Sequence, residues 1–295
     1  MIHRRFMTLL AVLLSALTLS TGPASAQPGG GRFSVMTYNI RLDLASDGAD
    51  AWPNRRNMVA ALIGYYAPDL IGLQEVLHHQ KQALEADLPG YAFIGAARDD
   101  GREAGEYSPI GYRRDRYRLL ASGTFWLSPT PDVPGKGWDA AYPRIATWAQ
   151  LAERRGGRRL LMVNTHLDHL GLVARLEGAR QLRRWIAQHR KAGEPVVLTG
   201  DFNSRADSDA YRAVVAPGAG ALHDTLRLTR TPHFGPPGTF NAFKITQAQP
   251  GAIDHVFVSD GIHVLRHATL TQHEGGRLPS DHYPVLADLC AGPRC

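Results

Sequence analysis

The sequence predicts a single α/β domain in which helices cover β-sheets. Apolar runs of strand length follow one another directly in parts of the chain and alternate with helical stretches in others, a pattern typical of sheets with helices outside. Of the 295 residues, 44% are hydrophobic and 20% are charged, which excludes a disordered polymer, a collagen-like chain and a disulfide-dense miniprotein. The Pro- and Gly-rich stretches Pro129–Trp138 and Thr231–Gly238 are too short to separate two domains.

The N-terminal 26 residues have the pattern of a secretory signal peptide. Two arginines precede the apolar run Phe6–Leu19, and Ala24-Ser25-Ala26 supplies small residues for cleavage before Gln27. An uncleaved anchor is the alternative, but the run is shorter than the ~20 residues of a spanning helix. We therefore expect a secreted or periplasmic protein with a linker at 27–32, one folded domain at 33–289, a tail at 290–295 and no transmembrane segment.

Strands are expected where short apolar runs are bounded by turn-forming residues. Gly156-Gly157 between two such runs indicates a hairpin turn. In chain order, the expected strands are Phe33–Ile40, Asp69–Gln74, Tyr91–Ala96, Ile110–Tyr112, Gly123–Leu127, Ile145–Ala152, Leu160–His166, Pro195–Thr199, Ile253–Val258 and Tyr283–Leu289.

Helices are expected where apolar residues recur at three- and four-residue steps. The first, Arg55–Tyr66, places Met58, Leu62 and Tyr65 on one face. A second is expected at His79–Leu88. The third, Val173–Gln188, follows from the recurrence of Leu172, Leu176, Ala179, Leu182 and Ile186.

The net charge and the cysteine content exclude few functional classes. Without residues 1–26 the chain keeps 31 basic and 27 acidic side chains, a net charge of +4. The basic residues form no long run, so charge alone does not predict nucleic-acid binding. Cys290 and Cys295 could close a small terminal loop in an exported protein, or could stay unpaired in a frayed tail. Neither lies near a histidine cluster, so neither is expected to act as a nucleophile or a zinc ligand.

Polar side chains gather where the expected strands end. Burying such groups is costly unless something binds them, and a hard divalent cation, Mg²⁺ or alternatively Mn²⁺ or Ca²⁺, would do so. We expect Glu75 and Asp281 to supply carboxylates to this ion, with the Asn39 amide assisting. Asp201 and Asn203 are two residues apart, so an extended backbone presents both on one side, where they could orient a water and the oxyanion it attacks.

Two histidines add proton donors to this set. His166 and His282 each follow an apolar run or an acidic residue. A histidine beside a carboxylate can titrate near neutrality, so Asp254 is a natural partner for one of them. The remaining histidines have no comparable spacing and are expected to be structural or exposed.

Taken together, these motifs resemble the endonuclease/exonuclease/phosphatase superfamily. This superfamily includes DNase I, exonuclease III-type repair nucleases, bacterial sphingomyelinases, inositol-polyphosphate 5-phosphatases and deadenylases. The resemblance covers residues 33–289 and implies a four-layer α/β/β/α sandwich, with two mixed sheets packed face to face. The motifs are Tyr38-Asn39-Ile40, Gln74-Glu75-Val76, Asn164-Thr165-His166, Gly200-Asp201-Phe202-Asn203, Ile253-Asp254-His255 and Ser280-Asp281-His282.

The resemblance implies a role for each polar residue at the strand ends. Asn39, Glu75 and Asp281 match the metal-binding positions of the family. Asp201 and Asn203 match the pair that aligns the attacking water and the phosphate.

It also implies roles for the histidines and for two further residues. His282 matches the terminal catalytic histidine, and His166 matches the other histidine of the nuclease and sphingomyelinase branches, with Asp254 as the acid that orients it. Tyr112 resembles a phosphate-contacting tyrosine, and Arg144 an arginine that reaches the phosphate region.

The function expected from these residues is in-line hydrolysis of a phosphoester by an activated water, most simply by a secreted phosphodiesterase or nuclease. A sphingomyelinase-like phospholipase C would share the catalytic set, and Phe125-Trp126 and Phe240–Phe243 are candidates for its lipid-contacting aromatics. A phosphomonoesterase on the same fold is a further alternative. A non-catalytic binding module is disfavoured because no metal-site position holds an apolar residue. The motifs do not choose among DNA, RNA, nucleotides, sugar phosphates and phospholipid head groups, and we expect a monomer.

Overall fold

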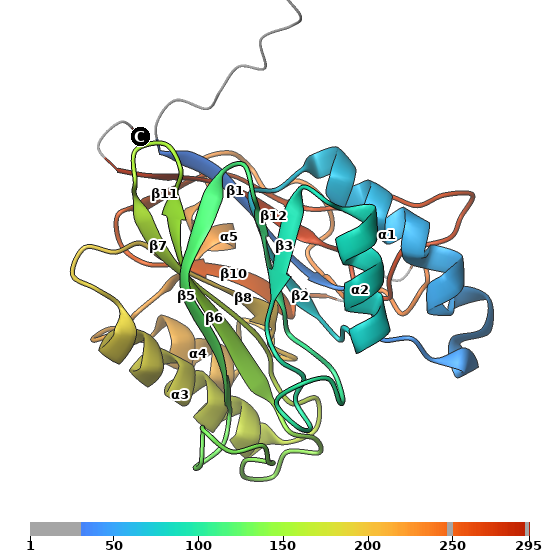
Figure 1. The fold of residues 1–295 in the computed structure, drawn as a ribbon, viewed down its shortest axis with the longest axis horizontal. Helices are drawn as coiled ribbons and strands as arrows, with labels where there is room; N and C mark the ends of the chain where they lie inside the picture. The colour runs from blue at the N-terminus through green and yellow to red at the C-terminus, as the bar shows by residue number, and fades with distance from the viewer. Residues whose placement is uncertain (1–30, 247–249, 293–294) are drawn as a thin grey trace, which may run out of the picture.

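Two β-sheets packed face to face form the centre of the molecule, and helices cover their outer faces (Figure 1). The computed structural model describes residues 31–246, 250–292 and 295, and it confirms the four-layer sandwich that the resemblance implied. The expected signal peptide, residues 1–26, lies outside this described part. Within the described residues, no helix is long and apolar enough to cross a membrane.

The first sheet has the order β11-β12-β1-β2-β4-β3. Only β1 and β2 run parallel in it, and the other neighbours are antiparallel. Its strands are β1 (Arg32–Asn39), β2 (Leu70–Gln74), β3 (Tyr91–Ile94), β4 (Ile110–Arg113), β11 (Ile262–Thr269) and β12 (Val285–Ala291).

The second sheet has the order β5-β6-β7-β8-β10-β9. Here β7 and β8 are the parallel pair. Its strands are β5 (Tyr117–Trp126), β6 (Ile145–Glu153), β7 (Arg159–His166), β8 (Val196–Asp201), β9 (His223–Asp224) and β10 (Asp254–Val258).

Alternation along the central strands divides the apolar side chains between two kinds of core. In β1, Val35 is buried between the two sheets with Met162 and Val197 of the opposite sheet. Its neighbour Met36 points the other way and packs with Ile63 of the first helix. Successive strand residues face opposite sides of a sheet, so one apolar run serves both layers.

The helices bury their apolar faces on the outer sides of the sheets. α1 (Trp52–Tyr66) and α2 (His78–Asp87) cover the first sheet, while α3 (Leu172–His189) and α4 (Asp209–Val215) cover the second. A 3-10 turn, η1 (Ala45–Asp50), precedes α1, and a short helix, α5 (Thr225–Leu228), follows β9.

The buried face of α1 differs from the expected one. Tyr65, expected on that face, is 84% exposed, whereas Val59 and Ile63 are fully buried and Leu62 nearly so. The helix begins at Trp52 rather than Arg55. Residues 59, 62, 63 and 66 form the stripe that meets the sheet, and Tyr65 lies on the opposite side of the helix.

Several short elements were not expected from the sequence. α4 is seven residues long and is capped by the Ser208 hydroxyl, which accepts from the backbone N–H of Tyr211. β11 alternates buried Ile262 and Val264 with exposed neighbours, but a register irregularity between Val264 and Arg266 interrupts its pairing with β12. The missed pieces are therefore short, or lie at the edge of a sheet.

The C-terminal cysteines are bonded to each other. Cys290 lies within β12, and a disulfide joins it to Cys295. Of the two alternatives left open by the sequence, the small terminal loop is the one that the structure contains.

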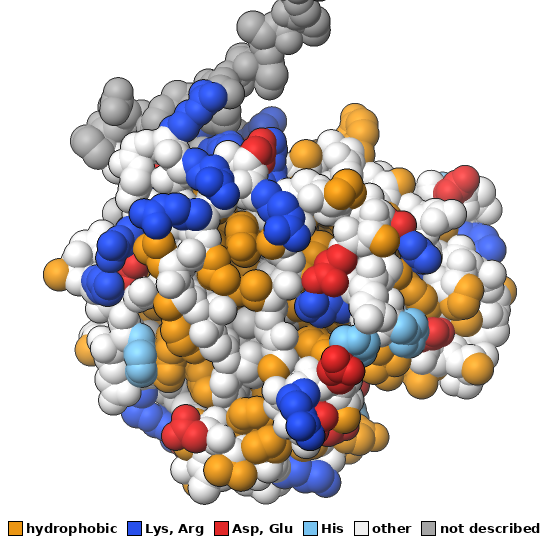
Figure 2. Space-filling view, viewed as in Figure 1, with side chains coloured by type: hydrophobic (Ala, Val, Ile, Leu, Met, Phe, Trp, Pro, Cys, Tyr) orange, Lys and Arg blue, Asp and Glu red, His pale blue; other side chains and the backbone are white. Residues whose placement is uncertain are grey.

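Basic side chains gather along the upper edge of the face shown in Figure 2, at the end of the sandwich where β1 begins. There Arg116 donates to the carbonyl of Arg32, and Arg154 to that of Arg114. Asn39, at the other end of the eight-residue β1, lies about 20 Å away at the usual rise per strand residue. The concentration of arginines is thus remote from the strand ends that carry Asn39.

Candidate active site

The polar residues of the sequence motifs meet at one end of the two sheets. His166 ends β7 and lies beside Asp201, which ends β8, in the parallel register. Asp254 begins β10 and lies opposite Asp201 in the antiparallel register. Asn39 ends β1 in the facing sheet. Sheet pairing alone therefore brings three of these side chains together from distant parts of the chain.

Asp201 lies at the centre of the site. Its Oδ2 accepts a hydrogen bond of 3.0 Å from the Asn39 amide and lies 3.6 Å from Nε2 of His166 and 3.7 Å from Nε2 of His282. Its Oδ1 accepts from the backbone N–H of Asn203 at 2.8 Å. Burial raises the pKa of Asp201 to about 7, so this carboxyl can exchange a proton near neutral pH.

His282 is oriented by Asp254. Its Nδ1 donates to Oδ2 of Asp254 at 2.9 Å, and both side chains are buried. Burial alone would lower the pKa of His282, but the carboxylates of Asp254 and Asp201 raise it well above its ordinary value. The expected pairing of Asp254 with His166 is therefore wrong. Asp254 is the first residue of β10, and it bonds His282 of the loop before β12 instead.

His166 has a different environment. The Asn203 side-chain amide donates to the Leu167 carbonyl at 3.0 Å and lies 3.1 Å from Nε2 of His166. On the other side of the ring, Nδ1 lies 3.9 Å from the Glu106 carboxylate. Burial and the charges of nearby arginines lower the pKa of His166 well below its ordinary value. The surroundings of the two histidines beside Asp201 thus favour opposite forms, the cationic form for His282 and the neutral form for His166.

Asn39, Glu75 and Asp281, which were expected to bind a cation, lie close together in the structure. The Asn39 amide donates to Oε1 of Glu75 at 3.0 Å, and Nη1 of Arg41 lies 3.9 Å from Glu75 and 3.8 Å from Asp281. Burial raises the pKa of Asp281, and the nearby charge of Glu75 raises it further. Two carboxylates that repel each other in a largely buried place suit a hard divalent cation. Asn39 turns its amide nitrogen toward Glu75, and its oxygen accepts from the Arg41 backbone N–H.

A second group of possible ligands overlaps the first. Ligand atoms of Asp201, Asp254 and His282 lie within 4.8 Å of one another. In this group the hydrogen bond between Asp254 and His282 already uses one oxygen and one nitrogen. Glu75 and Asp281 are not bonded to each other in this way, which favours their carboxylates as the cation ligands.

The backbone is strained at two of these positions. Glu75 and Asn203 have φ angles of 59° and 46°, in the left-handed region that non-glycine residues rarely adopt. Such strain is tolerated where surrounding contacts hold it, and it clusters at functional sites. Glu75 directly follows β2 and Asn203 lies two residues beyond the end of β8, so a turn after each strand directs the side chain into the site.

Tyr112 does not reach the site. It pairs with Leu70 at the start of β2 and packs against the core between the sheets, whereas Glu75 lies beyond the other end of that strand. Because β4 runs antiparallel to β2, its later residues point away from the site. The expected phosphate contact of Tyr112 is therefore wrong.

Arg144 lies near enough to His166 to influence its charge, and its expected contact with the phosphate region stays a prediction. Its Nε donates to Asp168 at 3.2 Å, and its Nη2 lies 3.0 Å from Nδ1 of His169. The Arg144 charge is, after burial, the largest cause of the lowered pKa of His166. His169 is exposed, in line with the expectation that it is structural or exposed, and it contacts Arg144.

Two further residues near His166 could not be found from the sequence pattern. Arg98 and Glu106 form an ion pair of 2.7 Å from a loop without periodicity. Both are close to the catalytic group, because Glu106 lies 3.9 Å from His166 and the Arg98 charge also lowers the pKa of that histidine.

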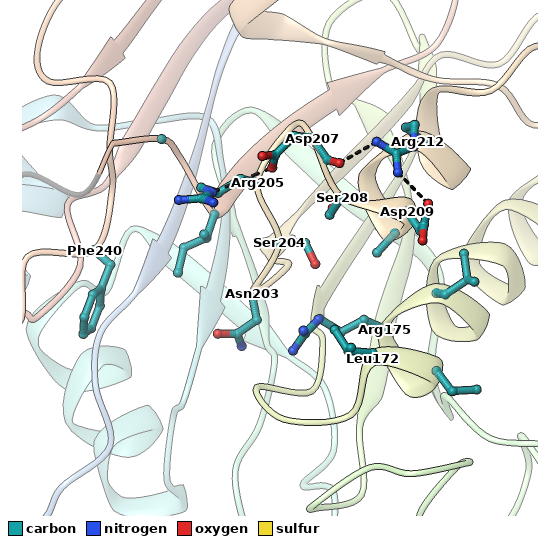
Figure 3. A pocket seen from close by; sticks show the side chains of 15 residues that line it. Leu172, Arg175, Asn203, Ser204, Arg205, Asp207, Ser208, Asp209, Arg212 and Phe240 are labelled. Atoms are coloured by element: carbon teal, nitrogen blue, oxygen red, sulfur yellow. Dashed lines mark hydrogen bonds and ion pairs between the residues drawn. The ribbon is translucent and has the colours of Figure 1, made fainter.

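A cavity of about 780 Å³ adjoins this centre through Asn203. Arg175 and Leu172 of α3 line one side, and Phe240 lines the other (Figure 3). The guanidinium of Arg175 points toward Asn203 in this view. The ring of Phe240 lies edge-on to His282, with 5.1 Å between the ring centroids. The cavity therefore opens between the Asn203 side chain and the ring that covers His282.

The fold and the site together define the class of phosphoester hydrolases built on a four-layer α/β sandwich. The sequence profile of the Endonuclease/Exonuclease/phosphatase family matches residues 36–282, so the chain belongs to this family. Its members are phosphoester hydrolases that depend on a divalent metal.

Solved structures and a curated protein resemble the chain over different lengths. An endonuclease/exonuclease/phosphatase family protein from Bacteroides thetaiotaomicron is 38% identical, with a TM-score of 0.85 and coverage of 89% of this chain and 98% of that one. A mannosyl-6-phosphatase from the same organism is also 38% identical, with a TM-score of 0.82 and coverage of 87% and 99%. Nocturnin of Drosophila melanogaster is 28% identical over 56% of this chain, which spans only 26% of that protein.

Proposed function

We propose that the chain is an exported, divalent-metal-dependent hydrolase that acts on phosphate esters of small soluble molecules. The observation that carries this proposal is the position of Asp201 Oδ2, within 3.7 Å of both catalytic histidine Nε2 atoms and bonded to the same Asn39 amide that bonds Glu75. A proton acceptor, two polar rings and a cation-binding group therefore share one small volume.

Glu75, Asp281 and Asn39 would hold the cation, with Mg²⁺, Mn²⁺ and Ca²⁺ as the candidates. When bound, such an ion withdraws electron density from phosphoryl oxygens and offsets the charge that develops on them. The two carboxylates supply only oxygen, which supports a hard ion rather than zinc.

The side chains then divide the remaining work. Asp201 accepts the proton of the attacking water, and Asn203, whose backbone N–H bonds Asp201, helps to hold that water in line with the phosphorus. His282, kept cationic by Asp254 and Asp201, donates to the phosphoryl oxygens or to the departing oxygen. The neutral His166 contributes a second ring contact on the other side of Asp201. Fixed donors of this kind stabilise charge that appears mainly in the transition state.

One comparison supports a small substrate over a long nucleic acid. The 38% identical relative that covers 87% of this chain is a phosphatase of a sugar phosphate. The expected nuclease or phosphodiesterase activity stays a prediction, and so do the sphingomyelinase-like alternative and the monomeric state.

Export rests on residues 1–26 and on the cysteines. The signal-like pattern precedes a domain whose last strand is closed by the Cys290–Cys295 disulfide. Disulfides persist mainly in oxidising compartments, which supports a secreted or periplasmic location.

A substrate panel tests the proposal. Purified residues 27–295 should hydrolyse p-nitrophenyl phosphate and sugar phosphates in the presence of Mg²⁺ or Mn²⁺, with activity abolished by EDTA and restored by excess metal. Plasmid DNA, RNA and sphingomyelin should be poor substrates. Activity that the chelator leaves unchanged would contradict the metal site, and preferential cleavage of DNA or of sphingomyelin would contradict the small substrate.

A further inference from the structure

Two buried arginines near His166 each keep one guanidinium N–H without a hydrogen-bond partner. Arg98 and Arg144 are 8% and 5% exposed. Within the described part of the chain, Nε of Arg98 and Nη1 of Arg144 are buried and donate no hydrogen bond, although Oδ1 of Asp99 lies 3.7 Å from that Nε. A buried donor left unpaired costs about 1–3 kcal/mol, so two of them in one place indicate a ligand.

Both guanidinium groups are held in fixed orientations. Arg98 donates from Nη1 to Glu106 at 2.7 Å, and its guanidinium carbon lies 4.8 Å from the ring centroid of Tyr142. Arg144 is held by Asp168 and His169 through Nε and Nη2. Each guanidinium is thus fixed by hydrogen bonds from some of its nitrogens, while one other N–H of each makes no hydrogen bond.

The charges of Arg98 and Arg144 influence each other and the same histidine, His166. Burial lowers the pKa of Arg98, and the like charge of Arg144 lowers it further, while Glu106 opposes both. Both arginines also lower the pKa of His166. Like charges placed together in a buried region are unfavourable unless anions neutralise them. Glu106 and Asp168 each bond one arginine, and Asp99 lies beside Arg98, but none of these carboxylates bonds both arginines.

We propose that Arg98 and Arg144 form an anion subsite that binds two non-bridging oxygens of a terminal phosphate, so that the enzyme selects phosphomonoesters over phosphodiesters. This inference rests on the proposed function. Arg144 was expected near the phosphate, whereas Arg98 is the added selectivity residue.

A monoester presents three non-bridging oxygens and, near neutral pH, up to two negative charges. One oxygen can face the cation-binding group while two face the arginines. A diester has only two such oxygens and one charge, and its second ester group would replace an oxygen at the subsite.

The test combines binding of inorganic phosphate with a comparison of two esters that share a leaving group. Arg98→Gln is compared with Arg98→Lys, and with Arg102→Gln, an exposed arginine of the same loop with 84% of its side chain accessible. Phosphate affinity is measured by calorimetry. The ratio of kcat/KM for p-nitrophenyl phosphate to that for bis-p-nitrophenyl phosphate is measured with Mg²⁺ present.

Wild-type protein should bind phosphate and favour the monoester. Arg98→Gln should weaken phosphate binding and lower kcat/KM for the monoester by about 10- to 100-fold, the value of a charge-assisted hydrogen bond, with less than about threefold change for the diester. Arg98→Lys keeps the charge without the planar guanidinium, so its phosphate affinity and its kcat/KM for the monoester should fall between those of wild type and Arg98→Gln. Arg102→Gln should match wild type in both quantities.

Equal losses on both esters, or unchanged phosphate affinity in a folded Arg98→Gln protein, would overturn the subsite. If Arg98→Gln does not fold, Arg98→Lys decides, because wild-type phosphate affinity and ester ratio in that variant would refute the role of the planar guanidinium. If wild type hydrolyses neither ester, the proposed function fails, and the phosphate calorimetry still decides whether Arg98 binds the anion.

Discussion

Replacement of Asp254 by asparagine tests how the site uses His282. The Asp254 carboxylate lies 2.9 Å from Nδ1 of His282, and its residue is 2% exposed, so the amide fits the same space but removes the charge. The imidazole then loses the group that fixes its tautomer and favours its cationic form. We expect kcat to fall by about 10²–10⁴, the contribution of a positioned acid–base group. The lost charge-assisted hydrogen bond should also lower the free energy of unfolding by about 1.5–3 kcal/mol.

The assay is steady-state hydrolysis of a p-nitrophenyl ester at saturating Mg²⁺, with urea unfolding of the same sample. Asp260→Asn is the matched control, because Asp260 also bonds a histidine, His223, at 2.8 Å but with 84% of its side chain exposed. It should leave kcat unchanged, since exposed pairs contribute little. A folded Asp254→Asn protein with more than about a third of wild-type kcat would refute the orienting role.

Three further predictions concern the metal, the substrate cavity and stability. Asp281→Asn should weaken Mg²⁺ activation, and Mg²⁺ at 100 times its Kd should stabilise wild type by about 2.7 kcal/mol in thermal unfolding but not this variant; equal stabilisation of both would argue against Asp281 as a ligand. Arg175→Ala, in the cavity of Figure 3, should raise KM several-fold, whereas Arg180→Ala on the exposed side of α3 should not; similar KM values for the two would remove the cavity from substrate binding. Burial lowers the pKa of His267 to about 4, with His233 adding to this and Asp224 opposing it. The unfolded chain therefore binds a proton that the folded chain does not, and stability should fall by about 3 kcal/mol as pH drops from 6.5 to 4. Urea unfolding at pH 7 and pH 4.5 checks this, and a His267→Gln protein with the same pH dependence would refute it.

The positions of the central strands and of the main catalytic groups could be predicted from the sequence because both depend on local patterns. The strand before Asp201 is an apolar run, and the polar residues directly after it stand out by contrast. Parallel strands carry their C-terminal ends to one edge, so His166 lies beside Asp201 once β7 pairs with β8, whereas Asn39 meets them because the two sheets pack face to face.

Partners and directions across the sheets could not be predicted in the same way. Tyr112 belongs to an expected strand, but whether it faces the site depends on the antiparallel pairing of β4 with β2, which no local pattern encodes. The partner of Asp254 depends on the loop geometry around His282. Arg98 and Glu106 come from a loop without periodicity, so only their contact in space reveals them.

The most direct test of the account is the single-turnover rate of Asp201→Asn, measured with the metal bound. Oδ2 of Asp201 is where the contacts of Asn39, His166 and His282 meet. We predict that this variant folds and binds Mn²⁺ in calorimetry but hydrolyses a phosphate ester at least about 10²-fold more slowly than wild type. Wild-type, EDTA-sensitive turnover by the purified variant would contradict the central role of this carboxylate.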